Sequence, residues 1–216
     1  MGKILVIGAS RGIGRAVCEA AAANGHPVRA MSRSGIAPRR RDDLIESWKG
    51  DALSGKDVAA ALEGTDTVVQ ALGVPPSLDM VTQPVTLFSR ATEVLLPAMK
   101  ATGVNRLIAL TGFGAGDCAR AISPLQRIPF RAVLGRAYDD KTVQENLIER
   151  SGLDWLIVRP GVLTNGRATD RYRVLDDPQS WRNGIIARAD VADYIAKQCG
   201  ADPLGGRKPV LIRYPL

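Results

Sequence analysis

A glycine-rich segment near the start of the chain has the composition of a phosphate-binding turn. It reads GASRGIG over Gly8–Gly14 and lies between an apolar run and a helical pattern. Gly8 allows a tight turn, Gly12 allows backbone to approach a phosphate, and Gly14 allows close packing of helix on strand. The free N–H groups and partial positive charge of the helix start favour a pyrophosphate. The residues that this pattern predicts at the pyrophosphate are Gly8, Ser10, Arg11, Gly12, Ile13 and Gly14. The alternative is a glycine turn needed only for packing.

The end of the second apolar run favours a phosphorylated dinucleotide. The run Val28–Ser32 is followed directly by Arg33. An NAD-specific site usually has Asp or Glu at this point to hold the ribose 2′-hydroxyl, whereas an Arg receives a 2′-phosphate. Ser32 and Arg33, helped by Arg11, therefore predict NADP(H) as the cofactor. The alternative is that Arg33 is an ordinary solvated arginine.

Two later segments follow apolar runs at places where the cofactor would pass. Asp51 can accept a hydrogen bond from the adenine amino group while Ala52 lies against the ring. Helix capping is the alternative role for Asp51, because Asp is favoured there. Leu72 and Gly73 would let the cofactor backbone pass closely.

The elements that would position these residues alternate between short apolar runs and helical patterns. We expect strands at Lys3–Ile7, Val28–Ser32, Ser47–Asp51, Thr67–Leu72, Arg106–Leu110, Leu153–Arg159 and Val210–Ile212. We expect helices at Ile13–Ala23, Lys56–Leu62, Val85–Thr102, Tyr138–Arg150 and Val191–Gln198. Continuously apolar strands are typical of a parallel sheet covered on both faces. The predicted fold is therefore α/β, a doubly wound and mostly parallel Rossmann-type sheet in one domain over residues 1–216, with residues 160–216 forming a small substrate lobe.

Three segments have no regular pattern, namely Ser34–Asp42, Gly112–Ile128 and Pro160–Ser180. All three follow expected strands, and the carboxyl edge of an open α/β sheet is where ligands bind. In the second segment, Phe113 and Leu125 can cover a planar ligand or pack against the lobe.

The composition excludes several classes of protein. The chain has 216 residues, 45% of them hydrophobic and 24% charged, which is typical of a folded globular protein. The three cysteines have no CxxC spacing, so no metal or dithiol site is expected. The one histidine, His26, lies in a turn and is predicted to be solvated, which leaves little room for Ser-His-Asp chemistry. No apolar run reaches the roughly 18 residues of a membrane span, and no secretory signal is recognisable, so a cytoplasmic location is predicted.

The formal charge of +7 raises the question of an anionic partner. One group of arginines, beside the predicted 2′-phosphate site, consists of Arg29, Arg33, Arg39, Arg40 and Arg41. A second group, which can attract an anionic substrate, consists of Arg120, Arg127, Arg131 and Arg136. Solvated surface is the alternative for both. Nucleic acid is not expected, because aromatics are only 5% and no binding motif is present. The expected partner is a small-molecule substrate, without a membrane, for a monomer or small homo-oligomer.

Several short motifs together resemble one superfamily over nearly the whole chain, from Gly2 to about Gln198. They are GASRGIGR, MSR, GDA, ALG, LTG, KTVQE and SGLDWLIVRPG. The chain resembles the short-chain dehydrogenases/reductases, most of all their atypical branch of NmrA-like proteins and the biliverdin reductase B/flavin reductase type. The resemblance implies NADP(H), with the nicotinamide near Thr111, Lys141 and the run Pro160, Gly161, Val162 and Leu163. It also implies a helix-rich C-terminal lobe.

The resemblance also implies a set of catalytic residues, which is incomplete here. In the superfamily a Tyr-x-x-x-Lys pair shares one helix face, and Lys141 matches the Lys. Ala137 stands at the Tyr position, and Tyr138 is displaced by one residue. That displacement rotates the side chain by about 100° around the helix, although an i,i+3 pair still shares a face. Thr111 matches the Ser or Thr that binds a substrate carbonyl; the alternative is a hydroxyl bonded to local backbone.

Two functions remain after these observations. The first is an NADP(H)-dependent oxidoreductase that uses Thr111, Tyr138 and Lys141 on a small carbonyl, flavin-like or tetrapyrrole-like substrate. The second is a non-catalytic NADP(H)-binding sensor or assembly protein of the NmrA-like type, which the displaced Tyr favours.

Overall fold

Eight strands form the central sheet in the computed structural model, which describes residues 2–36, 43–74 and 83–215. Their order is β3-β2-β1-β4-β5-β6-β10-β8. The bounds are β1 Ile4–Ile7, β2 Val28–Ser32, β3 Ile45–Lys49, β4 Thr67–Gln70, β5 Arg106–Leu110, β6 Asp154–Pro160, β8 Arg173–Leu175 and β10 Val210–Ile212. Neighbouring strands are parallel, except that β8 runs antiparallel to β10. The strand order reverses between β1 and β4, so the predicted doubly wound α/β fold is confirmed.

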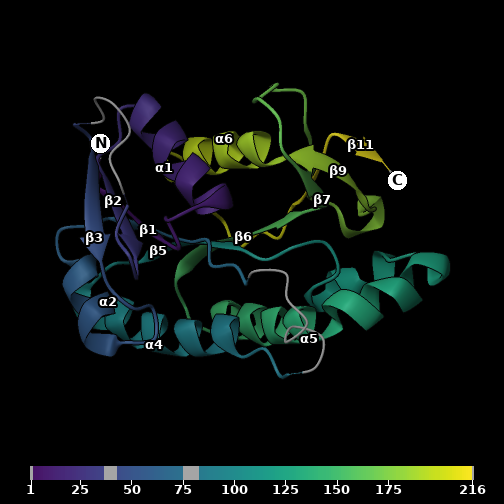
Figure 1. The fold of residues 1–216 in the computed structure, drawn as a ribbon, viewed down its shortest axis with the longest axis horizontal. Coiled ribbons are helices and arrows are strands. Elements are labelled where there is room, and N and C mark those ends of the chain that lie inside the picture. Colours follow the sequence, from purple (N-terminus) through teal and green to yellow (C-terminus); the bar gives the residue numbers. More distant parts are fainter. Residues whose placement is uncertain (1, 37–42, 75–82, 216) are drawn as a thin grey trace.

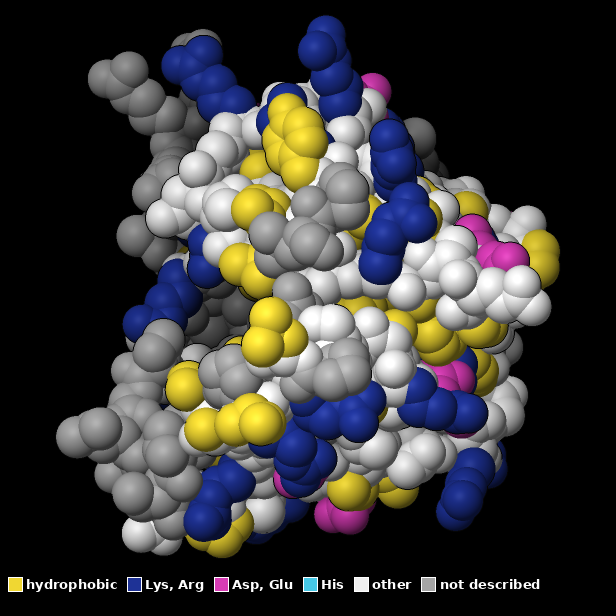
Figure 2. All heavy atoms as spheres, turned by 90° about the vertical axis from the view of Figure 1, so that its right-hand side faces the viewer, with side chains coloured by type: hydrophobic (Ala, Val, Ile, Leu, Met, Phe, Trp, Pro, Cys, Tyr) yellow, Lys and Arg dark blue, Asp and Glu magenta, His cyan; other side chains and the backbone are white. Residues whose placement is uncertain are grey.

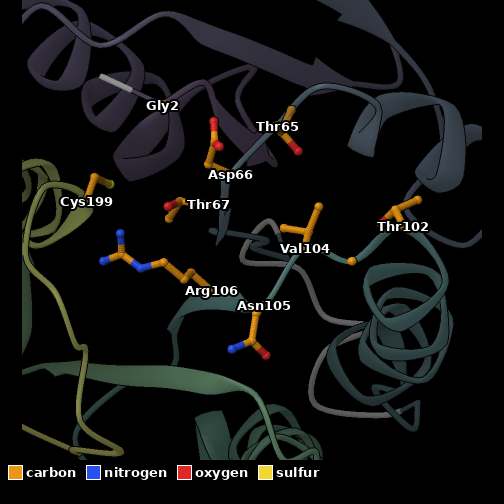
Figure 3. Close-up of a pocket in the computed structure, with 10 residues that line it drawn as sticks. Gly2, Thr65, Asp66, Thr67, Thr102, Val104, Asn105, Arg106 and Cys199 are labelled. Carbon is orange, nitrogen blue, oxygen red and sulfur yellow. The ribbon is translucent and has the colours of Figure 1, made fainter.

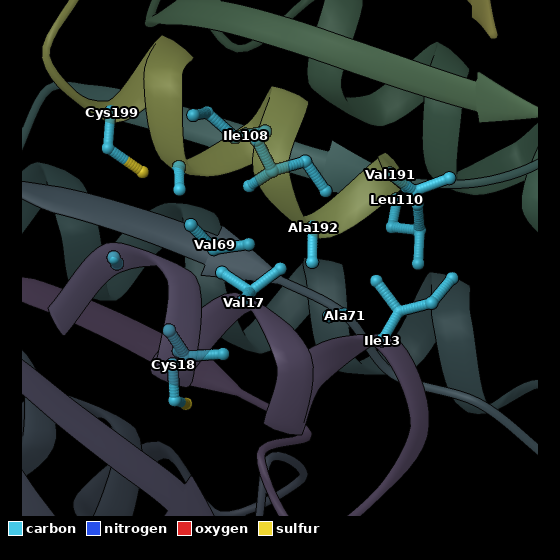
Figure 4. Close-up of a cluster of buried hydrophobic side chains, with 14 of the residues drawn as sticks. Ile13, Val17, Cys18, Val69, Ala71, Ile108, Leu110, Val191, Ala192 and Cys199 are labelled. Atoms are coloured by element: carbon cyan, nitrogen blue, oxygen red, sulfur yellow. The ribbon is translucent and has the colours of Figure 1, made fainter. Parts of the chain in front are cut away.

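Helices cover both faces of this sheet (Figure 1). On one face lie α1 Gly12–Ala23 and α6 Arg188–Cys199, and on the other α2 Gly55–Leu62, α4 Leu87–Thr102 and α5 Pro124–Glu149. Successive strand side chains point to opposite faces. In β1, Val6 belongs to the buried cluster under α1 and α6, whereas Leu5 belongs to the cluster under α2 and α4. Figure 4 shows the first cluster, where Val17 of α1 lies near Val69 of the sheet and Val191 of α6 lies near Leu110. Burial on both faces explains why the strands are continuously apolar.

Five short strands, one α-helix and one 3₁₀ helix lie within residues 160–215, so the implied helix-rich lobe is wrong. Within residues 160–215, β7 Val162–Thr164, β9 Gly184–Ala187 and β11 Tyr214–Pro215 form a second sheet in the order β11-β9-β7. The strands β8 and β10 instead extend the central sheet, and α6 packs against α1. Strands of two to four residues are too short to leave a readable alternation in the sequence.

The segment Gly112–Ile128 is more regular than predicted. It contains a 3₁₀ helix, Gly116–Ala121, and the start of α5. The helix expected from Tyr138 begins at Pro124 instead, because proline is tolerated in a first helical turn. Figure 1 shows that this early part of α5 extends beyond the sheet.

None of the helices among the described residues has both the length and the apolar character to cross a membrane.

The open alternatives for Phe113 and Leu125 are resolved by their burial. Phe113 is buried in a cluster with Ile122 and Leu175, so it packs against the lobe. Leu125 is 88% exposed and points away from the protein interior.

His26 is buried beside Gly200 rather than solvated, and its Nδ1 has no partner among the described residues.

Candidate functional site

A cleft of about 540 Å³ opens at the carboxyl edge of the central sheet, at the point where the strand order reverses. Of the predicted site residues, it is lined by Gly8, Ser10, Arg11, Gly12, Ile13, Ser32, Arg33, Asp51, Ala52, Leu72, Gly73, Thr111, Lys141 and Pro160. Four predicted residues do not line it, namely Gly14, Tyr138, Gly161 and Val162. Segments far apart in sequence therefore meet in one continuous hollow.

The glycine turn has the geometry of a phosphate cradle. Gly8 has a φ of +95°, and a Cβ there would lie 2.6 Å from the carbonyl oxygen of Ala71. Gly12 has a φ of +61°, and a Cβ there would meet no atom within 4 Å, so this side of the turn is open. Arg11, the residue before α1, makes no side-chain capping hydrogen bond. The first N–H groups of α1 are thus available to a phosphate, and the turn fits the pyrophosphate of a dinucleotide.

Gly14 serves packing rather than contact with the cleft. A Cβ at Gly14 would lie 2.2 Å from the carbonyl oxygen of Gly8. The absent side chain is what lets α1 start directly over the turn. The prediction that Gly14 allows close packing therefore agrees with the geometry, although the residue does not face the cleft.

At the other end of the cleft, Arg33 is exposed and Ser32 is committed to a local turn. The hydroxyl of Ser32 donates to the carbonyl of Gly35 at 2.9 Å. Arg33 lines the cleft and has no side-chain partner among the described residues, so its guanidinium is placed to receive an anion.

Asp51 lines the cleft and is not a helix cap. The cap of α2 is Ser54, whose side chain accepts from the N–H of Asp57. Asp51 instead accepts from the N–H of Leu53 at 3.0 Å. The capping alternative for Asp51 is therefore wrong, and one carboxylate oxygen stays available for a ligand.

The first arginine group does not form one patch. Arg29 is buried, its Nε lies 3.1 Å from Glu46 Oε2, and its Nη1 donates to the carbonyls of Ala61 and Glu63. Arg29 therefore binds β2 to β3 and α2 and does not face a phosphate. The residues Arg39, Arg40 and Arg41 lie outside the described residues.

Lys141 stands at the inner end of the cleft. Its Nζ donates to the carbonyl of Thr111 at 2.6 Å and lies 5.0 Å from the ring centre of Phe88. Burial lowers the pKa of Lys141 to about 8, although the nearby Glu145 carboxylate acts to raise it. The neighbouring Asp140 accepts from the N–H groups of Phe88 and Ser89 at the start of α4. That contact pins α5 against α4 and fixes the position of Lys141.

The hydroxyl of Thr111 is committed to a buried ion pair. It donates to Glu145 Oε1 at 2.6 Å, and that carboxylate is 2.6 Å from Nη2 of Arg159. Nη2 also lies 2.6 Å from Asp117, which in turn pairs with Lys208. The alternative that Thr111 bonds local backbone is therefore wrong. No contact between Glu145 and Arg159 was predicted, although Glu145 lies in the motif KTVQE and Arg159 in the motif SGLDWLIVRPG.

Tyr138 lies beside Lys141 but outside the cleft lining. A Cβ added at Gly112 would lie 2.5 Å from the Tyr138 hydroxyl, so this oxygen sits against the backbone there. Its ring packs edge-on against Phe130 with centroids 4.7 Å apart. Burial raises the pKa of Tyr138 to about 12. Its role as a proton donor stays a prediction.

The lobe contributes three residues to the lining: Pro160, Leu163 and Arg188. Gly161 and Val162, which lie between Pro160 and Leu163 in the chain, do not face the cleft. A Cβ at Gly161 would lie 2.2 Å from the carbonyl oxygen of Gly184, and Val162 is half exposed. Arg188 was not predicted, because it lies at the start of a helix with no motif to mark it.

None of the arginines in the second predicted group lines the cleft, and Figure 2 shows basic side chains spread among apolar ones on that side of the molecule.

A second hollow, of about 480 Å³, lies at the opposite edge of the sheet (Figure 3). It is formed where strands begin, by Thr67 of β4, Arg106 of β5 and Asp66. The charged residues of this hollow are already paired. The carboxylate of Asp66 accepts from the backbone N–H of Lys3, and Nε of Arg106 lies 3.7 Å from Oδ2 of Asp154. Because ligands of such folds bind at the carboxyl edge, the first cleft is the candidate site.

Within the described ranges, no group of three or more His, Cys, Asp or Glu side chains could hold a metal ion.

The chain is similar to known proteins over most of its length. A family model described as NAD(P)H-binding matches residues 8–202. Among solved structures, the anaerobilin reductase ChuY of Escherichia coli O157:H7 is 26% identical, with a TM-score of 0.78 over 98% of this chain and 97% of that one. The oxidoreductase YlbE of Lactococcus lactis is 20% identical, with a TM-score of 0.80 over 99% and 91%, which shows a shared fold. An uncharacterized chloroplastic protein of Arabidopsis thaliana is 26% identical over 88% of this chain and 69% of its own length.

Proposed function

Because the chain belongs to the NAD(P)H-binding family, we propose that it is an NADP(H)-dependent oxidoreductase of the atypical short-chain dehydrogenase/reductase type. Its substrate is a small carbonyl, flavin-like or tetrapyrrole-like compound. The observation that carries this proposal is the single cleft that joins the glycine turn to Lys141 and Thr111. When bound, the nicotinamide supplies or accepts the hydride, and the protein supplies binding and orientation.

Each part of the cleft has a distinct task in this proposal. The turn around Gly12 binds the pyrophosphate, Arg33 binds the 2′-phosphate, and Asp51 binds the adenine amino group. Lys141 holds the nicotinamide ribose and is held in turn by the Thr111 carbonyl. Pro160, at the end of β6, borders the nicotinamide. A water at the cleft mouth or a neighbouring side chain supplies the proton, because hydride transfer to an extended conjugated substrate demands little acid catalysis.

The similarity to an anaerobilin reductase supports a reductase acting on a planar conjugated substrate. The size of the cleft supports the same class, since about 540 Å³ lies in the range of small-molecule and cofactor sites. A large sugar nucleotide fits this chain less well, because the lobe of residues 160–216 is small.

The test is NADPH oxidation with a panel of flavins, biliverdin, quinones and small aldehydes. We expect turnover with at least one planar acceptor, and less turnover after Lys141→Met. If the protein binds NADPH and no panel member oxidises it, the oxidoreductase proposal fails.

The second candidate is a non-catalytic NADP(H)-binding sensor of the NmrA-like type. Two observations favour it: Tyr138 does not line the cleft, and the Thr111 hydroxyl is engaged by Glu145. Tight NADPH binding without turnover, together with a change in protease sensitivity on binding, would support this candidate.

The choice of NADP(H) over NAD(H) rests on Arg33 and has its own test. We expect Arg33→Ala to weaken NADPH binding by about 10- to 100-fold, the loss of one charge-assisted contact of about 1.5–3 kcal/mol. NADH has no 2′-phosphate, so its affinity should change by less than about twofold and serves as the internal control. Isothermal titration with both nucleotides gives the ratio. An unchanged ratio would remove Arg33 from the 2′-phosphate site.

A further inference from the structure

The small lobe brings one charged side chain into the cleft. Its contributions to the lining among the described residues are Pro160, Leu163 and Arg188. Two of these are apolar, and Arg188 is a cation. Whatever the lobe recognises in a ligand, it therefore recognises through an apolar surface and one guanidinium.

The position of Arg188 is set by the second sheet. Strand β7 continues from the end of β6, and it pairs in parallel with β9 so that Thr164 lies opposite Ala187. Arg188 follows β9 directly as the first residue of α6. The same pairing carries Leu163 into the cleft beside Pro160. The sheet thus holds an arginine and an apolar side chain at the substrate end of the site.

The partner of Arg188 is neutral. Its Nη1 donates to the side-chain oxygen of Asn165 at 2.7 Å, and none of the ion pairs found in the described ranges involves it. Two other lobe cations are paired with carboxylates instead: Arg207 lies 3.3 Å from Asp176, and Lys197 lies 2.6 Å from Asp170. An amide contact orients the guanidinium without neutralising it, so its charge acts on the cleft.

The charges around the cleft are unequal in sign. The charged residues that line it are Arg11, Arg33, Lys141, Arg188 and one acid, Asp51. Asp51 belongs to the adenine end, beside Arg33 and the loop after β3. At the substrate end, the described lining consists of cations, of Thr111, whose hydroxyl is engaged by Glu145, and of apolar residues such as Leu87 and Leu110. A neutral substrate would leave the Arg188 charge uncompensated there.

We propose that Arg188 binds an acidic group of the substrate, a carboxylate or a phosphate, so that this protein selects planar apolar molecules that carry such a group. The inference rests on the proposed function and narrows its substrate class. The guanidinium offers two parallel N–H donors to a carboxylate or phosphate, which gives orientation as well as affinity. Leu163 and Pro160 then contact the apolar frame of the same molecule.

The experiment compares matched substrates that differ only in the acidic group. Suitable pairs are biliverdin with its dimethyl ester, and flavin mononucleotide with riboflavin. In the wild-type protein we expect a lower KM for the acidic member of the pair. In Arg188→Ala, the KM of the acidic member should rise by about 10- to 100-fold, as for a lost charge-assisted hydrogen bond of about 1.5–3 kcal/mol, while that of the neutral member changes by less than about twofold.

Two controls separate this effect from a general change in charge. Arg171→Ala removes the same charge from an exposed lobe residue that does not line the cleft, and should leave both KM values unchanged. Arg188→Lys keeps the charge without the paired donors, and should recover part of the preference.

Three results would overturn the inference. One is an equal effect of Arg188→Ala on both members of a pair. Another is a wild-type protein without preference for the acidic member. The third is a loss of NADPH affinity as large as the loss in KM, which would assign Arg188 to the cofactor phosphates.

Failure of the proposed function is distinguishable from failure of this inference. If no pair is turned over, the same molecules are titrated into the protein saturated with NADP⁺. Tighter binding of the acidic member that disappears in Arg188→Ala supports the inference for a binding protein. Equal binding of both members refutes it.

Discussion

Lys141 combines burial, a positive charge and a position at the inner end of the cleft. Within the described part of the chain, its Nζ has one hydrogen-bond acceptor, the Thr111 carbonyl, and the rings of Phe88 and Tyr138 lie near it. A buried ammonium with so few acceptors is costly to keep charged, which is why the pKa falls to about 8. A bound anionic nucleotide would stabilise the charge again. Cofactor binding and the protonation of Lys141 should therefore be linked.

The linkage has a definite direction. Below about pH 8 the folded protein carries Lys141 charged, and above it the charge is lost. The dissociation constant of NADPH should therefore rise as the pH increases through about 8, measured by fluorescence titration between pH 7 and 9.5. Lys141→Met should bind NADPH more weakly at pH 7 and should lack this step. A step of the same size in Lys141→Met would assign the titration to another group.

The folding equilibrium should respond in the opposite sense. Between the folded pKa of about 8 and the ordinary value of 10.5, the unfolded chain binds a proton that the folded one does not. Lys141 therefore contributes a gain in stability as the pH rises through this window. That gain, absent in Lys141→Met, is a check that does not depend on any ligand.

At this scale, the sequence predicted the residues that line the cleft better than those that hold them in place. Gly12, Arg33 and Lys141 stand in motifs or at strand ends whose positions follow from the fold alone. The engagement of Thr111 by Glu145, and the position of Arg188, depend on side-chain directions and on the pairing of short strands. Such contacts join residues distant in sequence, and no local pattern records them.

The glycine turn shows how the elements divide their work. At Gly14 the backbone of the turn leaves no space for a Cβ, which would lie 2.2 Å from the Gly8 carbonyl oxygen. At Gly12 the space is open, and only the φ of +61° is unfavourable for another residue. Gly14 is required by the packing of α1, whereas the open side at Gly12 leaves space for the proposed pyrophosphate.

This division predicts different outcomes for two alanine variants. Gly12→Ala should lower the free energy of unfolding by about 1–2 kcal/mol, the cost of a left-handed conformation. Gly14→Ala should lower it more, because backbone must move to relieve the contact. Urea unfolding of the ligand-free proteins gives both values. In NADPH titrations, Gly12→Ala should lose more affinity than its small loss of stability would explain. Equal stability losses for the two variants would contradict this division.

The elements themselves were predicted unevenly, for physical reasons. The core strands and α1 could be found because both faces of the sheet are buried and their apolar runs are continuous. The sequence pattern did not predict a helix over the first half of α5, because proline and glycine residues such as Pro124 and Gly135 are typical of helix ends. Packing against the 3₁₀ helix and the neighbouring elements outweighs that local preference.

Across the whole molecule, the positive charge is distributed by function rather than gathered in one surface. Arg29 and Arg159 are buried in structural ion pairs, whereas Arg33 and Arg188 line the cleft. Figure 2 shows basic side chains dispersed over one side of the molecule instead of forming a continuous tract. The excess of +7 is therefore better explained by a cleft for anions than by a nucleic-acid surface.

A polar network ties the site to the outside of the protein. It runs from Thr111 through Glu145 and Arg159 to Asp117 and Lys208. The side chains of Glu145 and Arg159 are 1% and 0% exposed, while that of Lys208 is 20% exposed. Arg159 also lies 4.9 Å from the ring centre of Trp181, which adds a contact to the lobe. The inner and outer halves of this network should therefore differ in energetic weight.

Removal of Glu145 leaves Arg159 buried with less compensation, so Glu145→Ala should lower the free energy of unfolding by about 3–5 kcal/mol. Lys208→Ala, at the solvent end, should cost no more than about 1 kcal/mol, because water replaces the lost partner. Urea unfolding at pH 7 gives both values, and Glu145→Gln, which keeps the shape and an acceptor for Thr111, should fall between them. If Glu145→Ala and Lys208→Ala cost the same, apolar packing rather than the ion pair holds α5 to β6. The position of Lys141 would then depend on the Asp140 contact with α4 alone.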